Sequence, residues 1–165
     1  MRFKNRVGSF VVLTRKNRSE VFLVLRSDFP VWEPQGSGIE KDETPKQCAI
    51  REAYEEAGFK IKIVRKVAEY INPKTKLIDS HIYEGRYLSG KYIREYSECE
   101  GKWFSVNNLP KNMVAIRKMM IKDCLNNNKL ITKNNINLIS KQNIKLFVSM
   151  PIKSLACLIK KTVRF

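Results

Sequence analysis

The sequence predicts an α/β domain in which helices pack on a mixed β-sheet. Apolar, β-branched runs at Val7–Thr14 and Val21–Arg26 flank the polar segment RKNRSE, as paired strands do. Residues 45–57 carry the start and stop signals of a helix, and further strand-like runs follow it. Because strands lie before and after this helix instead of alternating strictly with helices, the sheet is expected to be mixed.

Three more strands are expected after this helix, separated by turn-forming residues. They are Ile61–Tyr70, Ser80–Leu88 and Gly101–Val106, with turns at residues 72–74 and 89–91. Residues 31–43 hold Trp, Pro and Gly at short intervals and are expected to form neither a helix nor a strand.

The ends of the first helix are set by capping chemistry. Thr44 is expected to be its N-cap, Pro45 occupies the first helical position, and Gln47 completes a capping box. Gly58 supplies the residue that ends the helix in a left-handed conformation.

A domain boundary is expected at the three asparagines 126–128, which end a second predicted helix at Val114–Leu125. This divides the chain into a domain, 1–128, and a basic extension, 129–165. Beyond Pro151 the extension has the apolar spacing of a helix, with one face formed by Ile152, Leu155, Ala156, Ile159 and Val163. That face is expected to pack on the domain, with the lysines on its solvated side.

The formal net charge of +16 lies mainly in the C-terminal third. Residues 1–110 hold 20 lysines and arginines against 15 acids, whereas residues 111–165 hold 12 against the single acid Asp123. Such a segment attracts nucleic acid or an anionic membrane surface. Since it is also rich in Asn, Ile and Lys, compositional drift explains the charge equally well, and both interpretations stay open.

The composition favours a packed, cytoplasmic protein without stable membrane insertion. Hydrophobic residues make up 43% of the chain, and no run approaches the ~18 apolar residues of a membrane span. The N-terminal apolar stretch is short and has no cleavage site for a signal peptidase. Four widely spaced cysteines and one histidine exclude the usual zinc spacings and give no disulfide framework.

Three glutamates on the first helix, Glu52, Glu55 and Glu56, are related as i, i+3 and i+4 and share one side. The neighbouring apolar arc is formed by Ala49, Ile50, Ala53, Tyr54 and Ala57. Like charges at this spacing repel by a few tenths of a kcal/mol per pair, so the cluster suggests a bound cation. Oxygen ligands favour Mg²⁺ or Mn²⁺ over zinc. From spacing alone, a solvated acidic face is the alternative.

The residues around these glutamates resemble the signature of the Nudix hydrolases, G-x5-E-x7-R-E-U-x-E-E-x-G-U, where U is bulky and apolar. The specified positions that match at the required spacing are Glu43, Arg51, Glu52, Glu55, Glu56 and Gly58. Ser37, between Gly36 and Gly38, stands where the signature has its leading glycine, and Ala53 replaces a larger aliphatic residue. The resemblance covers residues 37–59 and implies a Nudix-type α/β/α sandwich.

The resemblance also implies a Mg²⁺-dependent hydrolase that cleaves a diphosphate linkage with a metal-activated water. Glu52, Glu55 and Glu56 would be the metal ligands, with Glu55 and Arg51 as catalytic residues and Arg51 orienting the carboxylates. Supporting positions would be Glu43 and the backbone of Ser37 and Gly38, which would lie beside the metal.

The general base of such enzymes often comes from a loop outside the signature. Glu98 is the preferred candidate here, with Glu100 second and Glu95 third. His81 lies in the middle of a predicted strand and is expected to be structural.

The signature is silent on the substrate, and the sequence leaves the oligomeric state open. The run Trp32-Glu33-Pro34-Gln35-Gly36 is similar to the W-x-x-P-Q-G run of bacterial RNA pyrophosphohydrolases and dinucleoside polyphosphate hydrolases. A small nucleoside di- or triphosphate derivative is preferred, with RNA 5′ ends or dinucleoside polyphosphates as the alternative. A non-catalytic Nudix fold that binds nucleic acid or membrane through its basic tail is a third interpretation. The complete set of signature carboxylates speaks against it.

Overall fold

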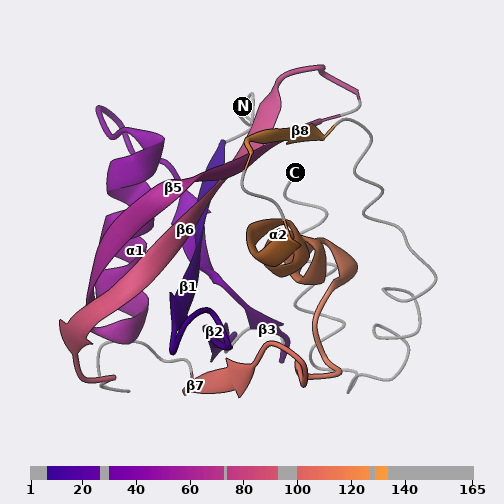
Figure 1. The fold of residues 1–165 in the computed structure, drawn as a ribbon. Coiled ribbons are helices and arrows are strands. Elements are labelled where there is room, and N and C mark those ends of the chain that lie inside the picture. The colour runs from indigo at the N-terminus through magenta and orange to yellow at the C-terminus, as the bar shows by residue number, and fades with distance from the viewer. Residues whose placement is uncertain (1–6, 27–29, 73, 93–99, 127–128, 134–165) are drawn as a thin grey trace.

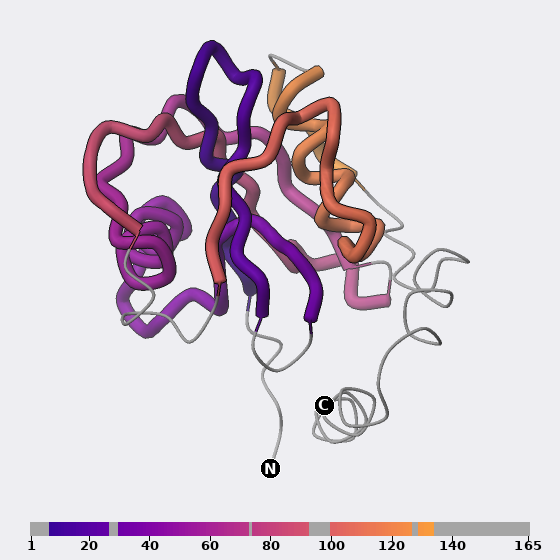
Figure 2. Tube along the Cα trace, turned by 90° about the horizontal axis from the view of Figure 1, so that it is seen from below, coloured from indigo at the N-terminus to yellow at the C-terminus, as the bar shows by residue number. Residues whose placement is uncertain are grey.

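The fold is a mixed sheet between two helices, seen in a computed structural model that describes residues 7–26, 30–72, 74–92, 100–126 and 129–133. The helices are α1 (Pro45–Ala57) and α2 (Ala115–Asn126). The strands are β1 (Gly8–Arg15), β2 (Glu20–Leu25), β3 (Trp32–Glu33), β4 (Gln35–Gly38), β5 (Phe59–Ile71), β6 (Ile78–Gly90), β7 (Glu100–Ser105) and β8 (Ile131–Lys133). The two helices cover opposite faces of the sheet (Figures 1 and 2).

The strand order is β3-β2-β1-β6-β5-β8, with β4 also paired to β1 and β7 to β2. Strand β1 serves two antiparallel neighbours because its first half, Gly8–Val11, pairs with β4 and its last residues, Leu13–Arg15, pair with β2. The β1·β6 and β5·β8 pairs are parallel and the others are antiparallel. The predicted mixed sheet is therefore confirmed, and the five predicted strands are found within two residues of their expected ends.

The expectation that residues 31–43 contain no strand was wrong, because β3 and β4 lie there. Gly36 explains why the segment can join the sheet: its φ is +152°, and a Cβ atom at this position would lie 2.3 Å from the Ser9 carbonyl oxygen. Only glycine permits this approach of β4 to β1. Strand β1, with which β4 pairs, is distant in the sequence, so the local sequence around β4 does not predict this strand.

Helix α1 has the predicted ends. Gln47 N–H donates to Thr44 Oγ1 at 3.3 Å, Thr44 N–H donates to Gln47 Oε1 at 2.9 Å, and Gly58 has the left-handed φ of +68°. The apolar arc, however, was partly wrong, because Ile50 is 39% and Tyr54 60% exposed.

The side of α1 that is buried instead contains Cys48 and Glu52 together with Ala49, Ala53 and Ala57. The three alanines let the helix lie close to the sheet. Cys48 and Glu52 lie toward β4, where Ser37 is a polar partner of both. Ile50 and Tyr54, the bulkier residues of the expected arc, lie at the edge of the buried side.

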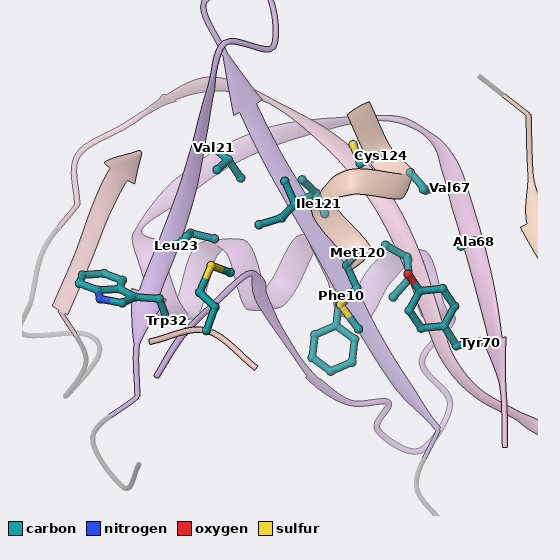
Figure 3. Close-up of a cluster of buried hydrophobic side chains, with 13 residues drawn as sticks. Phe10, Val21, Leu23, Trp32, Val67, Ala68, Tyr70, Met120, Ile121 and Cys124 are labelled. Atoms are coloured by element: carbon teal, nitrogen blue, oxygen red, sulfur yellow. The ribbon is translucent and has the colours of Figure 1, made fainter. Parts of the chain in front are cut away.

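The core has two layers that meet at the sheet. Phe10 and Val12 of β1 face α2, in the cluster drawn in Figure 3, whereas Val11 and Leu13 face α1. Trp32 packs edge-on against Phe104 in the first layer, with ring centroids 4.8 Å apart. Trp103 packs beside Phe22 in the second, at 5.2 Å. Trp32 is therefore a buried core residue, whereas Trp103 is half-buried and packs against the second layer.

The first residues after the expected boundary at 128 join the sheet. Ile131–Lys133 form β8, which pairs with β5, and Lys133 Nζ lies 2.7 Å from Oδ1 of the buried Asp123 on α2. The amphipathic helix expected at residues 152–163 lies outside the described residues, and the position of the boundary stays a prediction. Within the described ranges, neither helix has the length and apolar character needed to span a membrane.

Candidate active site

The acidic side of α1 lies against β4, and the strand supplies hydrogen-bond donors to it. The Gly36 N–H donates to Glu56 Oε2 at 3.2 Å, and the Ser37 hydroxyl donates to Glu52 Oε1. The start of the helix is fixed to β1 because Ser9 Oγ donates to the Pro45 carbonyl at 2.5 Å. Residue 36 of β4 thus contacts Glu56, and residue 37, a predicted supporting position, contacts Glu52.

Arg51 joins three carboxylates. Its Nε and Nη2 atoms bind the two oxygens of Glu43 at 2.9 and 3.0 Å. Its Nη1 donates to Glu52 Oε1 at 2.5 Å and to Glu55 Oε2 at 2.8 Å. The charge-assisted bonds from Arg51 to Glu43 lower the pKa of the Glu43 carboxyl to about 2. The bonds to Glu43, Glu55 and Glu52 together raise the pKa of Arg51.

Glu56 has the opposite electrostatic environment. Burial raises the pKa of its carboxyl to about 8, and the negative charges of Glu52 and Glu33 act in the same direction. The hydrogen bond from Gly36 and the charge of Arg26 offset only part of this effect. An ionised Glu56 would therefore gain from a nearby cation, because burial and like charges both oppose its ionisation.

The donor chemistry of this patch fits a hard divalent cation. Among the described residues, the structure shows no three His, Cys, Asp or Glu side chains converging on one point. Arg51 accounts for this, since it draws Glu52 and Glu55 toward itself while Glu56 is held by Gly36. In the described part of the chain these contacts involve one oxygen of each glutamate. The second oxygens are the ones that a cation would take.

An ion-pair network that the sequence did not reveal adjoins the patch. Glu33 is 5% exposed and lies between Arg26 Nη1 and Arg117 Nε, each at 2.9 Å from one of its oxygens. The Arg117 guanidinium also lies over the Phe10 ring, 4.0 Å from its centroid. The negative charge of Glu33 helps to raise the pKa of Glu56. Glu33 belongs to the Trp32–Gly36 run, but its partner Arg117 is 84 residues away on α2 and leaves no local signal.

Of the three candidate general bases, only Glu100 lies within the described residues. Glu98 and Glu95 lie outside the described residues. Glu100 is the first residue of β7, opposite Leu25 of β2, and pairs with Lys102.

His81 was expected to be structural. Its Nδ1 atom lies 3.5 Å from Oε1 of Glu69, its cross-strand neighbour on β5. The charged partner of His81 is thus a β5 carboxylate outside the signature.

The two cysteines in the described ranges are free and buried. Cys48 lies beneath the patch, with its sulfur 3.9 Å from the carbonyl oxygens of Ser37 and Gly38. Burial, reinforced by the charge of Glu43, raises the pKa of its thiol to about 11, which disfavours the reactive thiolate form.

Comparisons with known proteins place the chain in one family. The family model described as the NUDIX domain matches residues 4–124. A putative 8-oxo-dGTP diphosphatase of Bacillus subtilis is 32% identical over 120 residues, which cover 72% of this chain and 79% of that protein. An RNA pyrophosphohydrolase of a Nitratiruptor species is 35% identical over 92 residues, which cover 52% of this chain and 59% of that protein.

Solved structures show the same fold. An ADP-ribose pyrophosphatase from Streptococcus suis superimposes with a TM-score of 0.62 at 19% identity, covering 79% of this chain and all of that one. A UDP-X diphosphatase gives a TM-score of 0.63 at 18% identity, covering 79% of this chain and 68% of that one. These matches confirm the predicted α/β fold class.

Proposed function

The chain belongs to the Nudix family and is a hydrolase of phosphorus-containing anhydrides, and we propose that it hydrolyses a nucleoside triphosphate derivative with the aid of Mg²⁺. The products would be a nucleoside monophosphate and diphosphate, with the water oxygen added to one phosphorus. Mn²⁺ would substitute for Mg²⁺, because both ions prefer oxygen ligands. A cytoplasmic location stays a prediction.

The observation that carries the proposal is the electrostatic asymmetry of α1. Arg51 pairs with Glu43, Glu52 and Glu55, whereas Glu56 has no such pair with Arg51 among the described contacts and its pKa is raised to about 8, mainly by burial. A cation between Glu56 and its neighbours would relieve that repulsion. A divalent ion bound there supplies charge neutralisation for the diphosphate and lowers the pKa of a water molecule.

The residues then have separable tasks. Glu52, Glu55 and Glu56 would hold the ion, and Arg51, anchored by Glu43, would fix the orientation of two of these three carboxylates. The proton of the attacking water would pass to Glu98, with Glu100 and Glu95 as the other candidates. The backbone of Ser37 and Gly38 would border the ion.

The substrate class is supported by the extent of similarity. The Bacillus subtilis relative, whose name specifies 8-oxo-dGTP, matches over 120 residues, whereas the Nitratiruptor RNA pyrophosphohydrolase matches over 92. The second candidate, a 5′-triphosphorylated RNA end, is favoured by the Trp32–Gly36 run and by that shorter match. Because the matched relatives are hydrolases, an exclusively binding role for the fold is disfavoured.

A substrate panel tests the proposal. Full-length protein with Mg²⁺ is incubated with 8-oxo-dGTP, dihydroneopterin triphosphate, a dinucleoside polyphosphate and triphosphorylated RNA, and released products are identified by chromatography. We expect a nucleoside triphosphate derivative to give the highest kcat/KM and EDTA to abolish turnover. Preference for RNA would support the second candidate instead.

The matched variants are Glu55→Gln and Asp79→Asn, which each neutralise one exposed acid. Glu55 lies in the patch and Asp79 lies on β6 outside it. Loss of turnover only in Glu55→Gln is expected. Equal turnover in wild type and Glu55→Gln would contradict a catalytic role for the glutamates of α1.

A further inference from the structure

Ser37 occupies the position at which the Nudix signature specifies glycine, and its side chain contacts a signature carboxylate. The Ser37 hydroxyl donates a hydrogen bond to Glu52 Oε1. A glycine has no side chain with which to make this bond. The departure from the signature therefore adds a contact inside the candidate metal site.

The position of Ser37 is fixed by backbone pairing. It lies on β4, directly opposite Ser9 of β1, and its carbonyl oxygen lies 3.9 Å from the buried Cys48 sulfur of α1. Strand and helix thus hold the hydroxyl at a defined distance from Glu52. A side chain on a paired strand positions a neighbour more sharply than one on a free loop.

The bond determines which oxygen of Glu52 is available. Oε1 accepts hydrogen bonds from both Ser37 and Arg51 Nη1, and the Glu52 side chain is 7% exposed. With Oε1 engaged twice, the carboxylate has one preferred orientation, and within the described residues Oε2 is the oxygen left for another partner. Fixing a glutamate before binding removes rotamer entropy that a ligand would otherwise have to offset.

We propose that Ser37 is a positioning residue that orients Glu52 for the divalent cation and raises the metal affinity of this enzyme. The inference rests on the proposed function, in which Glu52 is a metal ligand. It is specific to this chain because the signature residue at this position, glycine, provides no hydroxyl. The opposite effect, in which the hydroxyl competes with the cation for Glu52, would give weaker binding in wild type than in variants without the hydroxyl.

The experiment compares Ser37→Ala, Ser37→Gly and Ser37→Thr with wild type. Ala removes the hydroxyl and keeps Cβ, Gly restores the signature residue, and Thr keeps a hydroxyl on a residue that suits a strand. Metal-free, full-length protein is titrated with Mn²⁺ alone, and free Mn²⁺ is measured by electron paramagnetic resonance. Thermal unfolding of each metal-free variant shows whether the fold is retained, and the Gly variant guards against an Ala variant that fails to fold.

We expect Mn²⁺ to bind about tenfold more weakly to the Ala and Gly variants and nearly as in wild type to the Thr variant. The Mg²⁺ concentration for half-maximal hydrolysis should rise by the same factor in these two variants and stay near the wild-type value in the Thr variant. A purely structural serine would lower thermal stability without this selective shift.

Unchanged or tighter Mn²⁺ binding in both Ala and Gly variants would overturn the role of Ser37 while leaving the proposed function intact. Wild-type protein that binds no Mn²⁺ and hydrolyses no nucleotide would overturn the proposed function and this inference together.

Discussion

Arg51 binds Glu43 through two parallel hydrogen bonds, from Nε to Oε1 at 2.9 Å and from Nη2 to Oε2 at 3.0 Å. Glu43 precedes α1, so the pair ties the helix to the segment before it. The planar fork leaves Nη1 free to contact Glu52 and Glu55 at the same time. An ammonium group is a point charge and cannot reproduce this arrangement.

Replacing Arg51 with lysine should therefore lower kcat/KM by roughly 10- to 100-fold, as removal of partners that orient metal ligands does. The charge is kept, so the loss would come from geometry. Steady-state hydrolysis at saturating Mg²⁺ measures it, and Arg86→Lys, at an exposed position on β6, is the matched control. Similar kinetics in the two variants would contradict the positioning role of Arg51.

The raised pKa of Glu56 makes the stability of the metal-free protein depend on pH. Its folded-state pKa of about 8 lies above the ordinary value of 4.5, so between these values the native state holds a proton that the unfolded chain has released. This contribution to stability is complete below pH 4.5 and is lost as pH rises through about 8.

Urea unfolding in EDTA from about pH 5 to about pH 9 tests the effect. Glu56→Gln should flatten the fall in the free energy of unfolding across this window, whereas Asp79→Asn should leave it unchanged. Added Mg²⁺ should stabilise wild type above pH 8 more than it stabilises Glu56→Gln, because the ionised carboxylate then has a partner. Parallel curves for wild type and Glu56→Gln would argue against the burial of this charge.

His81 gives a second pH effect, with the opposite sign. Burial, assisted by the charge of Lys66, lowers the pKa of its imidazole below 6.5, and Glu69 offsets part of this. The unfolded chain therefore takes up a proton before the native state does, and stability is lost as pH falls below 6.5.

Because His81 is the single histidine of the chain, its ring proton can be followed by NMR without assignment by mutagenesis. We expect a titration midpoint below 6.5, and a His81→Gln variant should lose less stability than wild type on acidification from pH 7. A midpoint at or above 6.5 would show that Glu69, and not burial, governs the imidazole.

The features of α1 that depend on neighbouring residues could be predicted from the sequence. Thr44, Gln47 and Gly58 fix both ends of α1, and the spacing of Glu52, Glu55 and Glu56 places these residues on one side of the helix. The bounds of the carboxylate helix and the grouping of its three acids therefore follow from the sequence alone.

Contacts between distant segments could not be predicted from the sequence, because they depend on how the strands and helices pack together. The side of α1 that faces the sheet brings Glu52 to Ser37 of β4 and leaves Tyr54 exposed, and β4 pairs with β1 at Gly36, where a Cβ atom would meet the Ser9 carbonyl oxygen. The Glu33–Arg117 pair joins segments whose proximity is set by the packing of α2. The loop that contains Glu98 lies outside the described residues, and its role stays a prediction.

The C-terminal segment offers a test of where the catalytic domain ends. A chain that stops at residue 133 keeps β8, its pairing with β5 and the Lys133–Asp123 ion pair. A chain that stops at 128 loses all three, and Asp123, which also accepts from the Tyr70 hydroxyl at 2.8 Å, keeps a buried charge without its cation.

We expect both chains to hydrolyse small nucleotides nearly as well as the full-length protein, since neither truncation reaches α1. The shorter chain should be less stable by about 2 kcal/mol, the cost of removing one partner of a buried charged hydrogen bond. Lys133→Met in the full-length protein should reproduce most of this loss in urea unfolding. Aggregation of the chain that stops at 133 would instead show that residues 134–165 cover an apolar surface of the domain, and the boundary would then have to move beyond them.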